Sequence, residues 1–443
     1  MTRRRSSGPT MFASLAEPNF RTYVTGAFVS NIGTWVQRVA QDWLVLQLSG
    51  NSPVAVGITT ALQFLPALLL SPVGGLLADR FDKRRLLMFT QSWMAVSSLI
   101  LGLLAVTGSA ATVHVYVLAF VFGMGSALDV PARQAFVSEM VGAERLTNAI
   151  GLNSSAFNAA RLIGPGVAGL IIAAFGSGWA ILTNGVSYLA FLLALALLDE
   201  ARLVRSEPLP RAKGQLREGF RYVTQRSDLV VALGVGFAVG TWGMNFQMTN
   251  VLMARNEFGL GATAYGVLGS VMGIGSLVGA LLAARRKAAP SLRFVVASAS
   301  VFAVFLGISG LAPTAHVYAV CLPLLGLSAL ITLTATNMYV QTNVDAQVRG
   351  RVMALYMTLL MGGTPIGSPL LGLLADHFGP RAPMVGGALL QAATIILVVL
   401  VVRTVIARRG DDGPQAPITP QTPITPQTPI TPSATSRSDA AAS

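Results

Sequence analysis

The sequence predicts an all-α integral membrane protein with twelve transmembrane helices, arranged as two parallel six-helix repeats. Three observations predict this fold class: the composition, the apolar segments and a set of internal sequence matches. Of the 443 residues, 53% are hydrophobic and only 11% are charged. A soluble domain has about 25% charged residues, and one of this size needs them to cover its surface. Most of the surface is therefore expected to face lipid.

Twelve segments are long and apolar enough to cross a bilayer, which takes about 20 residues of helix. They are 22–47, 54–78, 86–107, 113–134, 148–174, 178–198, 229–253, 262–284, 292–312, 315–338, 352–375 and 382–403. Transmembrane helices tolerate the Gly and Pro residues found inside them. An even number of helices places both termini on the same side of the membrane.

The basic residues indicate which side that is. The two tails and the connections on their side of the membrane hold 27 of the 31 Lys and Arg residues. Arg255 and Arg381 lie on the other side, and Arg38 and Arg161 lie within helices. By the positive-inside rule, the side with 27 basic residues is cytoplasmic, and so are both termini. Small basic groups between apolar segments suit contact with anionic lipid, and they lack the single basic face that binding of nucleic acid needs.

Internal matches divide the chain into two halves. Gly33-Thr34-Trp35 recurs as Gly240-Thr241-Trp242, VGGLLADR at 73–80 recurs as VGALLAAR at 278–285, and TVHVY at 112–116 recurs as TAHVY at 314–318. These matches keep their order at nearly one offset, which indicates a duplication. Parallel repeats of this kind are typical of transporters that bind their substrate between the halves, near the middle of the membrane.

The expected organisation has five parts. They are a cytoplasmic N-tail (1–21), a first six-helix half (22–198), a basic cytoplasmic linker with an amphipathic helix (199–228), a second six-helix half (229–403) and a disordered Pro/Thr-rich cytoplasmic tail (404–443). The tail repeats PITPQT, a composition that does not pack a core. Cys321 is the single cysteine, which excludes an internal disulfide.

Residues 74–87 read GGLLADRFDKRRLL and carry six charges in seven positions. The pattern Gly-x-x-x-Asp-Arg-x-x-basic-basic resembles a cytoplasmic motif of the major facilitator superfamily, although Asp82 stands where that family usually has Gly. Its matching positions are Gly75, Asp79, Arg80, Lys83 and Arg84. Gly164-Pro165-x-x-x-Gly169 resembles the helix-five motif of the exporters in that superfamily. Residues 131–169 resemble the drug- and siderophore-exporter branch related to enterobactin exporters.

The resemblance covers about 15–403 and implies the major facilitator fold, a bacterial cytoplasmic membrane location and a monomer. It also implies that Gly75, Asp79, Arg80, Lys83 and Arg84 form a cytoplasmic gate. Glycine lets helices approach closely, and the implied neighbour is helix eleven. Arg80, Lys83 and Arg84 are expected to pair with carboxylates on adjacent helices. The candidate partner is Asp129. The alternative is a basic loop that only sets topology. The second repeat has Ala284 in place of Asp79, so the gate should be asymmetric.

Three charges lie well away from the ends of predicted helices, where each costs at least about 2.5 kcal/mol and is a functional candidate by default. Arg38 and Asp42 are four residues apart on one face of helix one, and Arg161 lies in helix five. We expect Asp42, held by Arg38 or Arg161, to change its protonation during transport. The alternative is a permanent pair that orders helix packing. The arginine that some family members carry on helix four is Ala119 here.

The remaining candidates are polar or flexible side chains expected to line a central cavity. They are Asn31, Thr34 and Gln41 on helix one, Asn245 and Met248 on helix seven, and Asn337 and Gln341 on helix ten. A mostly apolar cavity with a few amides and one charged patch suits amphipathic organic molecules. Gly164, Pro165 and Gly169 are expected to let helix five bend and pack tightly.

These observations predict a secondary active transporter that exports amphipathic small organic molecules (drugs, siderophores or secondary metabolites) by alternating access. The resemblance to the superfamily implies that protons are the coupling ion. Two alternatives stay open: an importer of a small organic solute, and a receptor or scaffold of the same fold that transports nothing. The sequence contains no HExxH, GxSxG or Walker motif, so neither an enzyme nor a cofactor or metal site is expected.

Overall fold

The structure is a computed structural model that describes residues 12–204, 215–286, 288–345 and 347–411. Residues up to Val402 belong to one compact unit, and residues 403–443 to a second. The beginning of the predicted N-tail (1–11), the middle of the linker (205–214) and most of the Pro/Thr-rich tail (412–443) lie outside the described residues, as does the side chain of Asp79.

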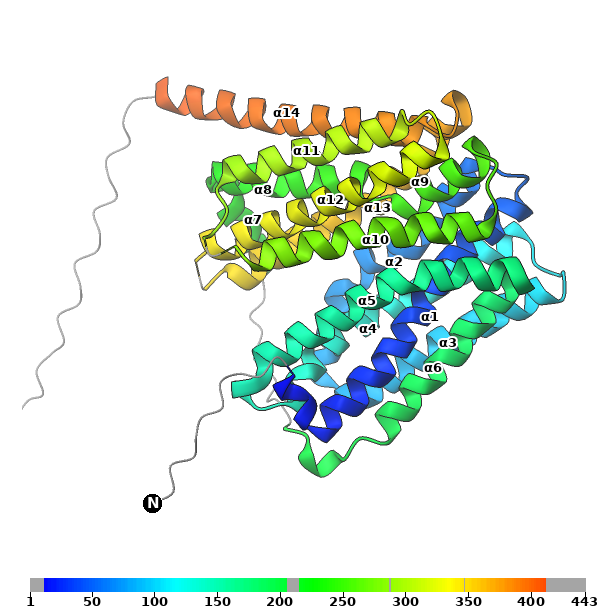
Figure 1. Cartoon of the computed structure of the whole chain (residues 1–443). Helices are drawn as coiled ribbons and strands as arrows, with labels where there is room; N and C mark the ends of the chain where they lie inside the picture. Colours follow the sequence, from blue (N-terminus) through cyan, green and yellow to red (C-terminus); the bar gives the residue numbers. More distant parts are fainter. Residues whose placement is uncertain (1–11, 205–214, 287, 346, 412–443) are drawn as a thin grey trace, which may run out of the picture. The chain divides into compact units, whose positions relative to one another are not determined.

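Long helices make up almost all of the described chain (Figure 1). The first half consists of α1 (Pro18–Leu48), α2 (Pro53–Arg80), α3 (Lys83–Val106), α4 (Thr112–Met140), α5 (Ala143–Phe175) and α6 (Ser177–Ala196). The second half consists of α8 (Ser227–Ala238), α9 (Phe246–Leu252), α10 (Ala262–Ala284), α11 (Leu292–Gly310), α12 (Ala315–Asn343), α13 (Arg349–Phe378) and α14 (Ala382–Asp411). Short helices lie at Ala13–Ala16, Glu200–Arg202 and Gln215–Gln225, the last of which is α7.

Eleven spans in the described residues are long and apolar enough to cross a membrane, and they correspond to predicted segments two to twelve. The twelfth helix is α1, which has 31 residues but also carries Arg38, Gln41 and Asp42. It packs against α5 and α6, and Gln41 and Asp42 are buried. Because neighbouring helices shield these side chains from lipid, α1 needs less apolar character than the others. The predicted all-helical membrane fold is confirmed.

Predicted segment 229–253 is not one regular helix. It consists of α8, a π-helical turn at Val239–Gly243, α9 and a second π-helical turn at Met253–Glu257. In the first turn, the Met244 amide donates to the Val239 carbonyl over 2.9 Å. Gly243 allows this turn to pack tightly, since a side chain there would meet the ring of Phe302. Such π-bulges frequently occur at functional sites.

The halves repeat one packing pattern within the unit that ends at Val402. In the first half α2 packs on α4, and in the second half α10 packs on α12. The halves are joined mainly by the packing of α2 on α13 and of α5 on α10, with smaller contacts of α1 and α2 on α9. Figure 1 shows α1–α6 and α8–α14 as two bundles that lie close together on the right and diverge on the left.

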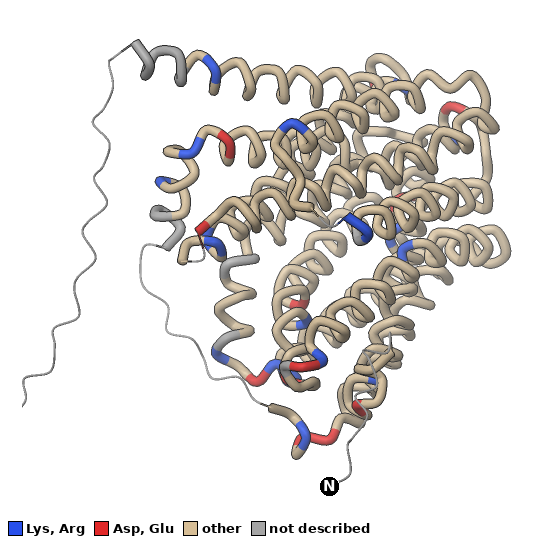
Figure 2. Tube along the Cα trace, turned by 60° about the vertical axis from the view of Figure 1, so that its left-hand side comes forward, with Lys and Arg blue, Asp and Glu red and all other residues tan. Residues whose placement is uncertain are grey.

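The connections between the helices lie at two ends of the bundles, and these ends differ in charge. The basic end holds the connections around 80–85, 140–145, 199–203 and 343–351, and the opposite end holds those around 49–52, 107–111, 258–261 and 379–381. Charged residues gather mainly toward the basic end, as Figure 2 shows. At this end α7 packs on α8 and α13. The Tyr222 hydroxyl of α7 donates to Asp345 over 3.0 Å, which fastens α7 to the second half.

Candidate transport site and gates

The charges of residues 80–85 form contacts inside the first half. The Lys83 ammonium group at the start of α3 donates to Glu139 of α4 over 2.5 Å. Arg84 pairs with Glu200 and donates to the carbonyl of Leu195 over 2.6 Å. Arg80 is exposed. Lys83 and Arg84 thus join α3 to α4 and to the end of α6.

Asp129, the carboxylate expected to hold these cations, has other partners. It pairs with Arg133 one helical turn further along α4. It also accepts hydrogen bonds from Thr90 over 2.8 Å and from Gln91 over 2.6 Å. No local pattern in the sequence indicates Glu139 and Glu200 as these partners, because they follow Lys83 and Arg84 by 56 and 116 residues.

Close contact between α2 and α13 occurs at Gly57, whereas Gly75 is half-buried. A Cβ atom at Gly57 would lie 2.5 Å from the carbonyl oxygen of Ser368. Gly372 of α13 makes a similar approach to α2, with the Pro53 carbonyl oxygen 3.0 Å from where its Cβ atom would be. These contacts lie toward the opposite end, because α2 begins there.

The Gly-Pro motif of α5 forms the second contact between the halves. A Cβ atom at Gly169 would lie 2.9 Å from the Ala262 carbonyl oxygen and 3.1 Å from the Gly266 Cα atom of α10. The Ser270 hydroxyl of α10 donates to the Leu162 carbonyl over 2.8 Å. Pro165 lies inside α5, between these two contacts. A side chain at Gly164 would instead meet Trp35 of α1.

The contact between α5 and α10 lies in the second part of α5. Nearer the basic end, Gly151 has no atom within 4 Å of the place of its missing side chain. At the opposite end, Asn256 donates to the Asn51 carbonyl over 3.0 Å and joins the halves again. The described contacts between the halves therefore lie toward the opposite end, and the helices separate toward the basic end.

Asp42 lies at one of these junctions. Its side chain is buried and interacts with the Tyr265 hydroxyl of α10, which donates to the Gln247 carbonyl over 3.4 Å. Trp43 stacks on the Tyr265 ring with centroids 6.0 Å apart, and the Arg255 guanidinium lies 5.6 Å from the Trp43 ring centroid. The carboxyl group of Asp42 in the first half thus contacts the second half directly.

Arg38 and Arg161 lie on the neighbouring helices α1 and α5. The Arg38 guanidinium carbon is 5.0 Å from the Trp35 ring centroid and 5.3 Å from that of Phe64. Its Nε atom is buried and has no hydrogen-bond partner. Arg161 is half-buried. Among the described residues, neither guanidinium forms a hydrogen bond or a close ion pair, and the charge of Arg38 acts on Asp42 only at longer range.

The candidate cavity residues differ in their surroundings. Thr34 donates to the Ser30 carbonyl and lies 3.1 Å from the Tyr188 hydroxyl, and Asn31 is half-buried. Both amide atoms of Gln41 and the Oδ1 atom of Asn245 are buried without a hydrogen-bond partner.

The other three candidates lie in the second half. Met248 is fully buried in the hydrophobic core. Gln341 donates to Asn337 over 2.5 Å on α12, and Gln341 is exposed.

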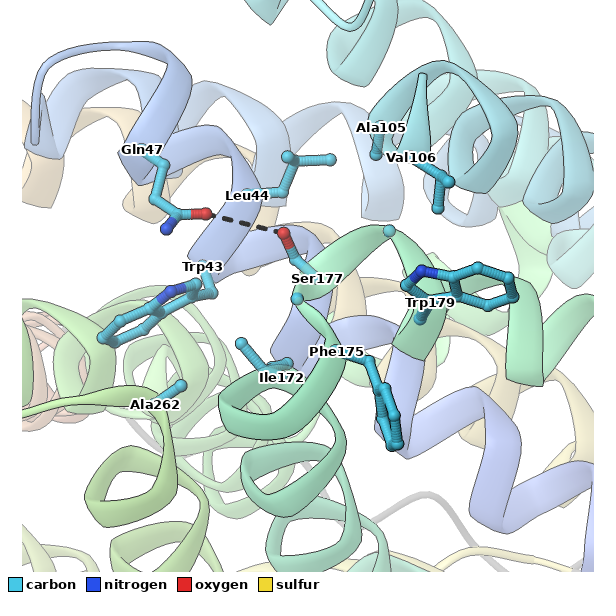
Figure 3. Close-up of a pocket in the computed structure, with 12 residues that line it drawn as sticks. Trp43, Leu44, Gln47, Ala105, Val106, Ile172, Phe175, Ser177, Trp179 and Ala262 are labelled. Atoms are coloured by element: carbon cyan, nitrogen blue, oxygen red, sulfur yellow. Dashed lines mark hydrogen bonds between the residues drawn. The ribbon is translucent and has the colours of Figure 1, made fainter. Parts of the chain in front are cut away.

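A cavity of about 450 Å³ lies at the opposite end of the first half (Figure 3). Gln47, Ser177 and the rings of Trp43, Phe175 and Trp179 are among its lining residues. Ser177 donates to Gln47 across it over 3.5 Å. None of the predicted site residues lines this cavity. It lies beside the junction at Trp43 and is separate from the candidate site at Arg38.

Residues 9–422 match the family described as transmembrane secretion effector, a branch of the major facilitator superfamily. The chain belongs to this family. Family members of known name support the resemblance seen in the sequence. The staphyloferrin A transporter of Staphylococcus aureus is 28% identical over 81% of this chain and 89% of its own length. The enterobactin exporters EntS of Shigella boydii and Escherichia coli are 27% identical over 87% of this chain and 92% of their own length.

Solved structures of transporters share the fold. A bacterial homologue of the human lysosomal transporter Spinster, in an inward-facing unoccupied conformation, has a TM-score of 0.67 at 15% identity. The alignment covers 88% of this chain and 97% of that one. A POT family transporter has a TM-score of 0.69 at 11% identity, over 90% and 99% of the two chains. These likenesses agree with the family match, which makes the protein a multi-pass membrane transporter of the major facilitator type.

Proposed function

We propose that this transporter exports an amphipathic small organic molecule of the siderophore or drug type from the bacterial cytoplasm, in exchange for protons. The basic end is then cytoplasmic, as the positive-inside rule predicts. The siderophore transporters that align with more than four fifths of the chain support the substrate class, and the enterobactin exporters among them support the outward direction. The protein acts as a monomer, with its substrate, protons and the surrounding lipid as its partners.

The single observation that carries the mechanism is the one-sided contact between the halves. The close helix contacts at Gly57 and Gly169 are the joints between the halves, and they hold the opposite end together. At Gly151, by contrast, no other atom lies near the place of the missing side chain of α5. Alternating access needs a second state in which these joints open and the basic end closes. The structure then corresponds to the state that loads substrate from the cytoplasm.

Asp42 is the proposed proton carrier. In this state its carboxyl group is buried and interacts with Tyr265 of the other half. Opening the opposite end separates α1 from α10 and exposes Asp42 to the external solution, where it takes up a proton. Reclosure carries that proton inward. Arg38, one helical turn toward the basic end, then favours its release by stabilising the charged carboxylate.

The test is efflux from everted membrane vesicles that hold the protein, with an imposed pH gradient. The probes are a lipophilic dye, a catecholate siderophore and a citrate-based siderophore. We expect gradient-driven accumulation of at least one probe, which Asp42→Asn abolishes while the protein stays folded. Tyr265→Phe keeps the carboxyl group and the ring, so it should retain coupling with altered rate. Transport by Asp42→Asn at the rate of the unaltered protein would refute the role of Asp42, and accumulation only in right-side-out vesicles would favour an importer.

A further inference from the structure

We propose that Arg38 and Arg161 bind two anionic groups of the transported molecule, which is an organic polyanion with an apolar body. This inference rests on the proposed transport function and deepens it by naming the charge and shape of the substrate.

The first argument is the absence of counter-ions. In the described part of the chain, Arg38 and Arg161 form no ion pair and no hydrogen bond, and the Arg38 Nε atom is buried without a partner. The nearest acidic side chain along α1 is Asp42, which acts on Arg38 only at longer range and interacts with the Tyr265 hydroxyl. By contrast, Arg133 inside α4 has Asp129 as its partner. Withdrawing a guanidinium from water is costly unless an anion contacts it, so a ligand anion is the natural partner for these two half-buried cations.

The second argument is the distance between the two cations. Gly164 packs on Trp35, and this contact sets the register of α5 against α1, which run in the same direction. Arg38 follows Trp35 by three residues, and Arg161 precedes Gly164 by three. Six residues of helix correspond to roughly 9 Å along the axis. Two carboxylate or catecholate groups on one mid-sized molecule can span this separation, whereas a single small anion would contact only one guanidinium.

The third argument is the apolar surface between the cations. Trp35 lies against Arg38 and contacts the Phe157 ring edge-on, with centroids 6.1 Å apart. Phe157 is 45% exposed and precedes Arg161 by one turn of α5. Phe64 of α2 lies on the other side of Arg38. An aromatic or aliphatic body would pack on these rings while its oxyanions reach the guanidinium groups, which bind planar oxyanions in a bidentate manner.

The fourth argument is access from the basic end. α5 leads from that end to Arg161, and Ser154 and Phe157 on the same face are exposed. Gly151, at the start of this path, has open space around it. A polyanion can therefore reach Arg161 first and Arg38 second without any movement of the joints at the opposite end.

The experiment is a binding measurement with purified protein in lipid nanodiscs, which needs no transport. The probe is a citrate-derived amphiphile with two free carboxylates, and its control is the uncharged carboxamide of the same size. The variants are Arg38→Gln and Arg161→Gln, and Arg286→Gln serves as an exposed control at the basic end. Each site variant should weaken binding of the carboxylate roughly 10- to 150-fold, and it should change binding of the carboxamide less than about 2-fold. Thermal unfolding checks that each variant is folded.

Two results would overturn the inference. Equal losses of affinity for the carboxylate and the carboxamide would mean that the arginines shape the cavity but do not recognise charge. Unchanged affinity for the carboxylate in both folded variants would mean that the arginines do not contact it. Either result leaves the export proposal intact if the vesicles still transport a probe. Loss of gradient-driven transport with intact charge-selective binding would instead refute the export proposal alone.

Discussion

The joint between α2 and α13 allows a direct test of alternating access. The change is Gly57→Ala, which adds one methyl group to α2. Its Cβ atom would lie 2.5 Å from the Ser368 carbonyl oxygen and 3.2 Å from the Pro369 Cα atom. Both are backbone atoms of α13, so the clash is relieved only if the two helices move apart. Gly74→Ala is the matched control, because its Cβ atom would lie 2.8 Å from the Ala127 carbonyl oxygen inside the first half.

Overpacking of this kind costs about 1–3 kcal/mol. The cost applies to the state in which the opposite end is closed, and it disappears in the state in which that end opens. Gly57→Ala should therefore shift the equilibrium between the two states by about 5- to 150-fold toward the second. Gly74→Ala destabilises both states alike, since its contact lies within one half, so it should lower stability without shifting the equilibrium.

The assay uses a single reporter cysteine at Ala262, which is 6% exposed at the joint between α5 and α10, in a background with Cys321→Ser. A membrane-impermeant maleimide is added on the side of the opposite end. Labelling should become faster with Gly57→Ala, by a factor within the range above, and should not change with Gly74→Ala. Equal labelling rates in the folded Gly57→Ala variant and the parent would refute the reasoning.

Three further predictions concern an ion pair, a buried hydrogen bond and the charge of the substrate. Asp129→Ala leaves Arg133 buried without its partner, so it should destabilise the fold by about 3–5 kcal/mol. Thermal unfolding should detect this loss, whereas exposed Arg80→Ala should melt like the parent. Tyr318→Phe removes the 2.5 Å bond to buried Asn250 and should cost about 1–3 kcal/mol, and an unchanged melting temperature would contradict it. If the substrate is anionic, 100 mV contributes about 2.3 kcal/mol per charge. Accumulation should then rise roughly 50-fold per charge with an imposed potential, and a voltage-independent flux would contradict this.

Much of the fold could be predicted because a membrane constrains sequence strongly. A helix that faces lipid must be apolar over its whole length, so segments such as 315–338 and 382–403 lie within α12 and α14. Hydropathy predicts α1 least well, because α5 and α6 shield its polar side chains from lipid. The π-helical turns near Gly240 and Met253 were not foreseen, because they depend on packing between helices and leave hydropathy unchanged.

The site was harder to predict because its contacts join residues that are far apart in the chain. Asp42 and Arg38 could be found as charges in an apolar segment, but nothing near them in the sequence indicates Tyr265. The partners of Lys83 and Arg84 were missed for the same reason. One signal was available for the joint: Ala262, Gly266 and Ser270 repeat every four residues on α10, and such small residues favour close helix contact.

The attachment of α7 has a mechanical consequence. Tyr222 and Gly219 fasten this helix to Asp345 and Arg351 of the second half, so any rocking of that half must carry α7 along. Phe220 on the same helix is 59% exposed, and an amphipathic helix at the basic end lies among lipid headgroups. Rocking of the second half would therefore move Phe220 through the layer of lipid headgroups. Turnover should then become slower as the viscosity of that layer rises.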